Sequence, residues 1–314
     1  MIHDLRSLRR LGLYLMLAAA PAAASDHVVV GGESIQAVIE SASDGDRILV
    51  HEGIYFEALD FRGKHLEVIG VSGAAFTVLD ATGAGAPVIR AASGEPVGTT
   101  LYGFAIRGGD GELRADLSAP LTCGGGVLVA GDSHLLLERC VIAGNGHSTA
   151  DLGGAIYAHG AGSRVDIVNC VVHANGARHG GGGAAAVGGA HAQVESSTIV
   201  NNYCAMSGGG VSGFVVGPGA TADFHEAIVW GNVGVDLGAP GWLGQGTITV
   251  SYSDIGGVWP GVGNQDVDPG FRDLPGQDFR LLESSPCIDA GDPQSAPDID
   301  GSFSDQGAGV DYSV

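Results

Sequence analysis

Cys140-Val-Ile-Ala-Gly-Asn145 and Cys170-Val-Val-His-Ala-Asn175 are two copies of one motif, with their asparagines 30 residues apart. Two more copies, Ser197-Thr-Ile-Val-Asn-Asn202 and Ala227-Ile-Val-Trp-Gly-Asn232, follow at steps of 27 and 30 residues. A pair of glycines keeps nearly the same step and recurs at Gly125-Gly126, Gly153-Gly154, Gly182-Gly183 and Gly209-Gly210. Two markers in phase indicate an internal repeat of about 27–30 residues.

Each repeat also contains a third short segment with apolar residues at alternate positions: Leu135-Leu-Leu137, Val165-Asp-Ile167, Ala192-Gln-Val194 and Ala222-Asp-Phe224. Three strands and three turns per unit cannot bury their apolar faces alone, so the units stack as coils about 4.8 Å apart. The sequence therefore predicts an all-β fold, a parallel β-helix with three short strands per coil. We expect the repeated asparagines to occupy one turn, where their amides hydrogen-bond from coil to coil.

The composition excludes several classes of protein. Glycine fills 55 of 314 positions, which argues against a helix-rich fold, and 45% hydrophobic residues argue against disorder. The formal net charge of -21 repels nucleic acid and anionic membranes, so we expect no nucleic-acid partner.

The amino terminus has the pattern of a secretory signal peptide. Arg6, Arg9 and Arg10 precede the apolar run Leu11 to Ala20, and small residues follow at Ala22 to Ala24. The apolar run is too short to span a membrane, and we expect no transmembrane segment in the mature chain. The sequence thus predicts a signal peptide over residues 1–24 and a secreted mature chain that starts near Ser25.

The mature chain divides into a β-helix over residues 25–263 and an Asp- and Pro-rich segment over residues 264–314. The amphipathic stretch Ser34 to Ala42 predicts a helix that closes the first coil, with Ser34 as its N-cap. The second segment departs from the repeat and is expected to be a C-terminal cap, because a solenoid must cover its open ends. Cys140 and Cys170 occupy the same inward position in adjacent coils, where we expect buried thiols rather than a strained disulfide.

Both ends of the chain resemble a known family. Ile35-Gln-Ala-Val-Ile-Glu40 and Asp44-Gly-Asp-Arg-Ile-Leu-Val50 resemble the first coil of secreted bacterial right-handed parallel β-helix proteins of the pectate-lyase-like superfamily. Asp268-Pro-Gly-Phe271 and Ser285-Pro-Cys-Ile-Asp-Ala-Gly-Asp292 are similar to the closing segment called choice-of-anchor Q. The resemblance implies a right-handed helix in a bacterial extracellular or cell-surface protein. It implies no single activity, because architecture defines the group.

Ionisable residues alternate with the inward residues of the third strand and face outward in rows. A pair such as Asp166 and Asp223 would lie two coils apart, roughly 9.6 Å, at the upper limit for an inverting glycosidase. The face therefore permits acid–base catalysis or ligand binding, and it equally fits an ordinary solvated sheet face. The candidate catalytic residues are Asp166, His191 and Asp223, and the candidate ligand-binding residues are His134, Arg164, Gln193, Glu195 and His225.

A second candidate site comes from the loops that follow the asparagine-bearing strands. Relatives with lyase activity remove a proton beside a uronate carboxylate, which needs a cation and a base. Arg178, His179 and His147 are the candidate catalytic residues, with Arg178 or His179 as the base. Asp110, Asp116 and Asp151 are candidate ligands for Ca²⁺, which prefers hard oxygen donors. The other interpretation is a set of polar loops without a catalytic role.

Three functions fit these residues. The first is a non-catalytic module, most simply a monomer, that binds an extracellular polysaccharide or another cell-surface component and requires no cofactor. The alternative is a polysaccharide lyase, epimerase or glycoside hydrolase acting on an acidic polysaccharide, with Ca²⁺ as a possible cofactor. The third is a structural component of an exported assembly. Three tryptophans of the late coils either stack on sugars or pack against the cap: Trp230, Trp242 and Trp259.

Overall fold

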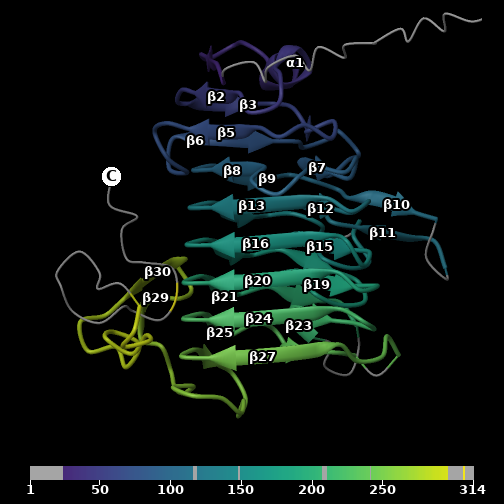
Figure 1. Ribbon diagram of the computed structural model, residues 1–314. Helices are drawn as coiled ribbons and strands as arrows, with labels where there is room; N and C mark the ends of the chain where they lie inside the picture. The colour runs from purple at the N-terminus through teal and green to yellow at the C-terminus, as the bar shows by residue number, and fades with distance from the viewer. Residues whose placement is uncertain are drawn as a thin grey trace, which may run out of the picture.

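The structure is a computed structural model that describes residues 24–115, 119–147, 149–206, 211–240, 242–295 and 307. Within these residues the chain winds into a parallel β-helix whose coils stack along one axis (Figure 1). This confirms the predicted fold class. The predicted signal peptide, except for Ala24, lies outside the described residues. No helix of the described part is long and apolar enough to cross a membrane.

Three parallel sheets form the walls of the helix, each with one strand from successive coils. In spatial order, sheet A contains β1 (Asp26–Val29), β2 (Arg47–Val50), β5 (Glu67–Gly70), β8 (Thr100–Tyr102), β13 (His134–Glu138), β16 (Arg164–Val168), β20 (His191–Glu195), β24 (Thr221–His225) and β27 (Thr247–Ser251). Sheet B contains β3 (Gly53–Tyr55), β6 (Thr77–Asp80), β9 (Ala105–Arg107), β14 (Val141–Ala143), β17 (Val171–His173), β21 (Thr198–Val200), β25 (Ile228–Trp230) and β28 (Asp254–Ile255). Sheet C contains β4 (Leu59–Asp60), β7 (Ile89–Ala91), β12 (Val127–Val129), β15 (Ile156–His159), β19 (Ala184–Val187), β23 (Val211–Val216) and β26 (Val235–Gly238).

One hydrophobic core runs along the axis inside the three sheets. The alternate residues of sheet A point inward as predicted: Leu135 and Leu137 pair with Val165 and Ile167 of the next coil, and all four are buried. Because the side-chain period of a strand is two, the residues between them face outward in every coil.

A ladder of buried asparagines connects the coils at the turn between sheets B and C. Asn145 donates from its backbone N and its Nδ2 to Oδ1 of Asn175, both at 3.0 Å. Asn175 makes the same two bonds to Asn202, and Asn202 to Asn232. The ladder ends on Oδ1 of Asp236, and burial raises the pKa of that carboxyl. The predicted coil-to-coil amide bonding is confirmed.

A second ladder connects the coils at the turn between sheets A and B. The backbone N of Cys140 lies 3.4 Å from Sγ of Cys170, and the backbone N of Cys170 donates to Oγ of Ser197 at 3.0 Å. Both cysteines are fully buried thiols, and burial raises the pKa of Cys170. This confirms the expectation of buried thiols rather than a bridge.

The first coil is closed as predicted. Helix α1 (Ile35–Ser41) begins after Ser34, whose Oγ accepts a hydrogen bond from the backbone N of Ala37 at 3.1 Å. Ile35 and Ile39 are fully buried against the first strands. The helix therefore covers the open end of the core.

The C-terminal segment covers the last coil and then turns back along the side of the helix (Figure 1). Trp259 packs against the end of the core, and Asn264 donates to the carbonyl of Val250 at 2.9 Å. The antiparallel hairpin β29 (Phe271–Asp273) and β30 (Asp278–Leu281) then lies on the outer face of sheet B, where Phe279 packs on His173. The sequence indicated a cap but gave no signal for this lateral packing.

Two further pairs of short strands complete the architecture. The antiparallel pair β10 (Glu112–Arg114) and β11 (Leu121–Cys123) projects from the helix, as Figure 1 shows. The parallel pair β18 (Gly176–Ala177) and β22 (Tyr203–Cys204) extends the stacking into the loops that follow the asparagines. These loops therefore keep coil-to-coil register.

We predict that Asn175→Ala lowers the free energy of unfolding by about 3–5 kcal/mol. The change removes the donor to the carbonyls of Ile142 and His173 and the acceptor for Asn145, all of them buried. Urea titration measures the effect. Gln193→Ala, which removes an amide from the outer face of sheet A, is the matched control and should change stability by about 0.5 kcal/mol or less. Equal losses in the two variants would contradict the role of the ladder.

His173 predicts a pH dependence of stability. Burial lowers its pKa to about 4, whereas an exposed imidazole titrates near 6.5. Between these pH values only the unfolded chain binds the proton, so stability falls as pH drops through this window, by up to about 3 kcal/mol. The charged groups of the hairpin near His173 are Asp278 and Arg280.

Urea titrations at pH 7, 5.5 and 4 test this expectation in three proteins. His173→Leu should lose this part of the acid sensitivity, whereas His51→Leu, which removes an imidazole from an exposed residue, should keep it. The same pH slope in His173→Leu and in the unmodified protein would refute the assignment.

Candidate functional site

The predicted rows of outward residues exist on sheet A. His134, Arg164 and His191 are register partners in successive coils, and Thr221 continues the row. Asp166, Gln193 and Asp223 form the neighbouring row. The sequence therefore placed these side chains on the correct face and in the correct coils.

The polar groups of this face are bonded to one another. Arg164 donates from Nε to Oδ1 of Asp166 at 2.7 Å and from Nη2 to Oε1 of Gln193 at 2.6 Å. Gln193 lies between Asp166 and Asp223, which are two coils or roughly 9.6 Å apart. An inverting glycosidase needs the space between its carboxyl groups for the sugar and a water molecule. The side chain of Gln193 projects from the intervening coil of that row, so the arrangement fits a paired polar face better than an acid–base pair.

The other predicted residues of sheet A have similar local partners. Nδ1 of His191 lies 2.8 Å from Oγ1 of Thr221, and its Nε2 lies 3.9 Å from Asp223. Nδ1 of His225 lies 3.0 Å from Oγ of Ser251. Gln193 also donates to Glu195 at 3.4 Å. These contacts support a solvated ladder of hydrogen bonds along sheet A.

The loops between sheets B and C bring three predicted residues together around one carboxylate. Asp151 is 7% exposed, and its Oδ2 accepts a hydrogen bond from the backbone N of Thr122 at 2.8 Å. Its Oδ1 lies 3.3 Å from Nη1 of Arg178 and 3.5 Å from Nδ1 of His179. Asp151 therefore holds the side chains of Arg178 and His179 in place at the surface.

Coil stacking explains why these residues meet. Leu152 forms parallel bridges to Cys123 in the preceding coil and to Gly180 in the following coil. The backbone N of His179 donates to the carbonyl of Asp151 at 2.9 Å. Residues one coil apart in sequence thus become neighbours, although 27 positions separate Asp151 from Arg178.

Trp242 completes this group from a later coil. Its ring lies 6.1 Å from the ring of His179 in an edge-on arrangement, and the residue is 48% exposed. The neighbouring Leu243 packs on a second apolar cluster, which covers the outer face of sheet C. We call Asp151, Arg178, His179 and Trp242 the Asp151 cluster. The sequence indicated a sugar-stacking role for Trp242 as one option but did not place it beside His179.

His147 does not join the Asp151 cluster by a direct contact. Its Nδ1 lies 3.0 Å from the hydroxyl of Tyr203, and the two rings stack with centroids 5.8 Å apart. Burial raises the pKa of Tyr203. Tyr203 was not predicted as a site residue. The sequence does contain a signal for it, because the residue after the repeated asparagine is glycine in the two preceding coils and tyrosine here. Gly176 is required there, because a Cβ atom would overlap the Tyr203 ring.

The predicted Ca²⁺ site stays a prediction. Asp116 lies outside the described residues, and both oxygens of Asp151 already have the partners given above. Within the described part of the chain, no group of three or more His, Cys, Asp or Glu side chains is arranged to hold a metal ion. The backbone N of Asp110 donates to the carbonyl of Ala86 at 3.0 Å.

The comparison with protein families agrees with the fold. Residues 98–252 match the family model of the right handed beta helix region, which supports the predicted right-handed winding. Pectin methylesterase from carrot is similar over 84% of this chain and 90% of its own, at 12% identity and a TM-score of 0.41. Pectate lyase Pel9A is similar over 90% of this chain and 96% of its own, at 15% identity and a TM-score of 0.41. No curated protein matches the chain.

We predict that Asp151→Ala lowers the free energy of unfolding by about 2 kcal/mol, because the backbone N of Thr122 loses a buried acceptor and Arg178 loses its ion pair. Chemical denaturation measures the loss. Asp223→Ala removes a carboxylate whose side chain is 52% exposed and serves as the control, with little expected change. A loss in Asp223→Ala as large as that in Asp151→Ala would contradict the anchoring role.

Proposed function

We propose that the protein is a non-catalytic β-helix that binds an extracellular polysaccharide through the Asp151 cluster. One observation supports the proposal most strongly: the half-exposed indole of Trp242 lies beside two hydrogen-bond donors that one buried carboxylate holds in place. Aromatic rings offer a flat apolar face to the C–H groups of a sugar. Fixed polar groups beside such a face then orient the ligand.

The chemistry of the cluster favours binding over proton abstraction. Arginine remains protonated in proteins, and Arg178 is paired with Asp151, so it serves as a donor rather than as a base. The ring of His179 lies between Asp151 and Trp242 and is suited to hydrogen bonding with a hydroxyl group. Stacking on Trp242 and donation from Arg178 and His179 require no bond cleavage.

The charge of the chain adds a preference among polymers. A net charge of -21 repels uronate polymers at low ionic strength, and Asp151 partly cancels the attraction of Arg178. We therefore expect neutral polysaccharides to bind more tightly than acidic ones at low salt, with the difference shrinking as salt is added.

We further propose that the protein acts outside a bacterial cell or at its surface, exported through a cleavable signal peptide. The Arg-flanked apolar run before Ser25 and the choice-of-anchor Q-like motifs near the C-terminus support this location. N-terminal sequencing of the exported protein should give a mature chain that begins near Ser25. Retention of residues 1–24 in the exported protein would contradict the proposal.

The binding test uses residues 25–314 in affinity gels that contain one neutral or one uronate polysaccharide each. Trp242→Ala should strongly reduce the retardation, because it removes the stacking surface. Phe56→Ala removes an aromatic ring that is 77% exposed and far in sequence from Trp242, and it should leave the retardation unchanged. Retardation that is undiminished in Trp242→Ala would refute the Asp151 cluster as the site. Release of unsaturated products or new reducing ends would instead favour the lyase or hydrolase alternative.

A further inference from the structure

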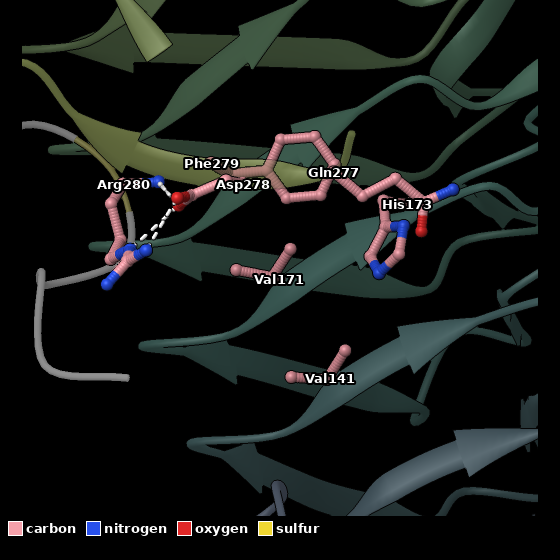
Figure 2. Close-up of a pocket in the computed structure, with 7 residues that line it drawn as sticks. All are labelled: Val141, Val171, His173, Gln277, Asp278, Phe279 and Arg280. Atoms are coloured by element: carbon pink, nitrogen blue, oxygen red, sulfur yellow. Dashed lines mark hydrogen bonds and ion pairs between the residues drawn. The ribbon is translucent and has the colours of Figure 1, made fainter. Parts of the chain in front are cut away.

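A cavity of about 140 Å³ lies between the C-terminal hairpin and the outer face of sheet B (Figure 2). Val141 and Val171 contribute its aliphatic side, and His173 lies at one end. The hairpin supplies the remaining lining through Gln277, Asp278, Phe279 and Arg280. The Asp151 cluster lies elsewhere, in the loops between sheets B and C.

The cavity is partly open to solvent and is not a void enclosed by packing. In this measure of volume a site for one water molecule needs only about 10–15 Å³, so the space holds a molecule of several heavy atoms. The hairpin and sheet B thus form a concave site rather than a sealed contact.

His173 is a polar residue among apolar neighbours on sheet B. Its register neighbours on sheet B, Ala143 and Val200, are both apolar. The imidazole is 9% exposed, and its Nδ1 has no hydrogen-bond partner among the residues that the structure describes. An apolar side chain would pack here without that penalty. A buried polar group without a partner calls for an explanation. Because Nδ1 is enclosed, a ligand in the cavity would bond to the ring at Nε2.

The lining determines the kind of ligand. Arg280 donates from Nε to Oδ1 of Asp278 at 2.7 Å, and this pairing lowers the pKa of Asp278 to about 2, so the two charges cancel. A charged ligand would find no uncompensated opposite charge. The valines and the Phe279 ring suit an apolar face, whereas Gln277 and His173 suit hydroxyl groups. These properties together describe a neutral pyranose ring.

We infer that this cavity binds one neutral sugar ring, a terminal or branch residue of a polysaccharide, with its C–H face on Val141, Val171 and Phe279 and its hydroxyls on His173 and Gln277. The ligand class rests on the proposed function, whereas the site is separate from the Asp151 cluster. The cavity would therefore give the protein a second contact with a glycan, on a different face.

The test titrates residues 25–314 with the neutral methyl glycosides of glucose, galactose and mannose, and with galacturonate. NMR follows the imidazole signals of His173 and the methyl signals of Val141 and Val171. We expect saturable shifts with at least one neutral glycoside and none with galacturonate. His173→Leu and Gln277→Asn should each weaken binding about tenfold, the loss expected for one hydrogen bond. His51→Leu is the control and should bind as the unmodified protein does.

Three results would overturn the inference: no shift with any neutral glycoside, shifts with galacturonate alone, or full affinity in both His173→Leu and Gln277→Asn. The use of two variants guards against misfolding of one. Failure of the proposed function is distinguishable, because polymer retardation would then be the same in Trp242→Ala as in the unmodified protein, while the His173 signals still respond to a glycoside.

Discussion

The hydrogen bonds between stacked asparagine side chains are the constraint on which the rest of the structure depends. In Asn145, Asn175 and Asn202, Nδ2 donates to Oδ1 of the next asparagine in the ladder and to two backbone carbonyls. A slip of one residue would leave all of these groups without partners and would also turn the core residues of the strands outward. Coil register is thereby fixed, and so is the position at which each following loop leaves the sheet. The meeting of Asp151 with Arg178 and His179 is a direct consequence.

The repeat made much of this predictable. A period of about 27–30 residues identified coils, and alternation within Val165-Asp-Ile167 and its counterparts identified inward and outward rows. Ser34 marked the start of α1 because capping chemistry is local. What could not be predicted depends on contacts outside the repeat. Trp242 reaches His179 through the loop between β26 and β27, which is longer than the corresponding loops of the two preceding coils. Phe279 reaches His173 because a non-repeating hairpin packs sideways.

The Asp151 cluster and the hairpin cavity differ in how their side chains are held in place. In the Asp151 cluster, a buried carboxylate orients exposed donors beside an exposed indole, so little ordering remains to be done when a ligand arrives. In the hairpin cavity, the imidazole of His173, whose Nδ1 has no partner among the described residues, packs on the ring of Phe279, and the Asp278–Arg280 ion pair lies at the other end. The outer face of sheet A has the most ionisable groups, yet these are bonded to one another along the rows. A count of charged residues would therefore favour sheet A, whereas the side-chain geometry favours the Asp151 cluster.

The proposed function is that the protein binds a polysaccharide at the Asp151 cluster without cleaving it. A crystal structure of residues 25–314 with an oligosaccharide of the best-retained polymer would test this function. We expect an intact glycan with one ring stacked on Trp242 and hydroxyls bonded to Arg178 and His179. A glycan bound along sheet A between Asp166 and Asp223, or a cleaved product at either place, would contradict it.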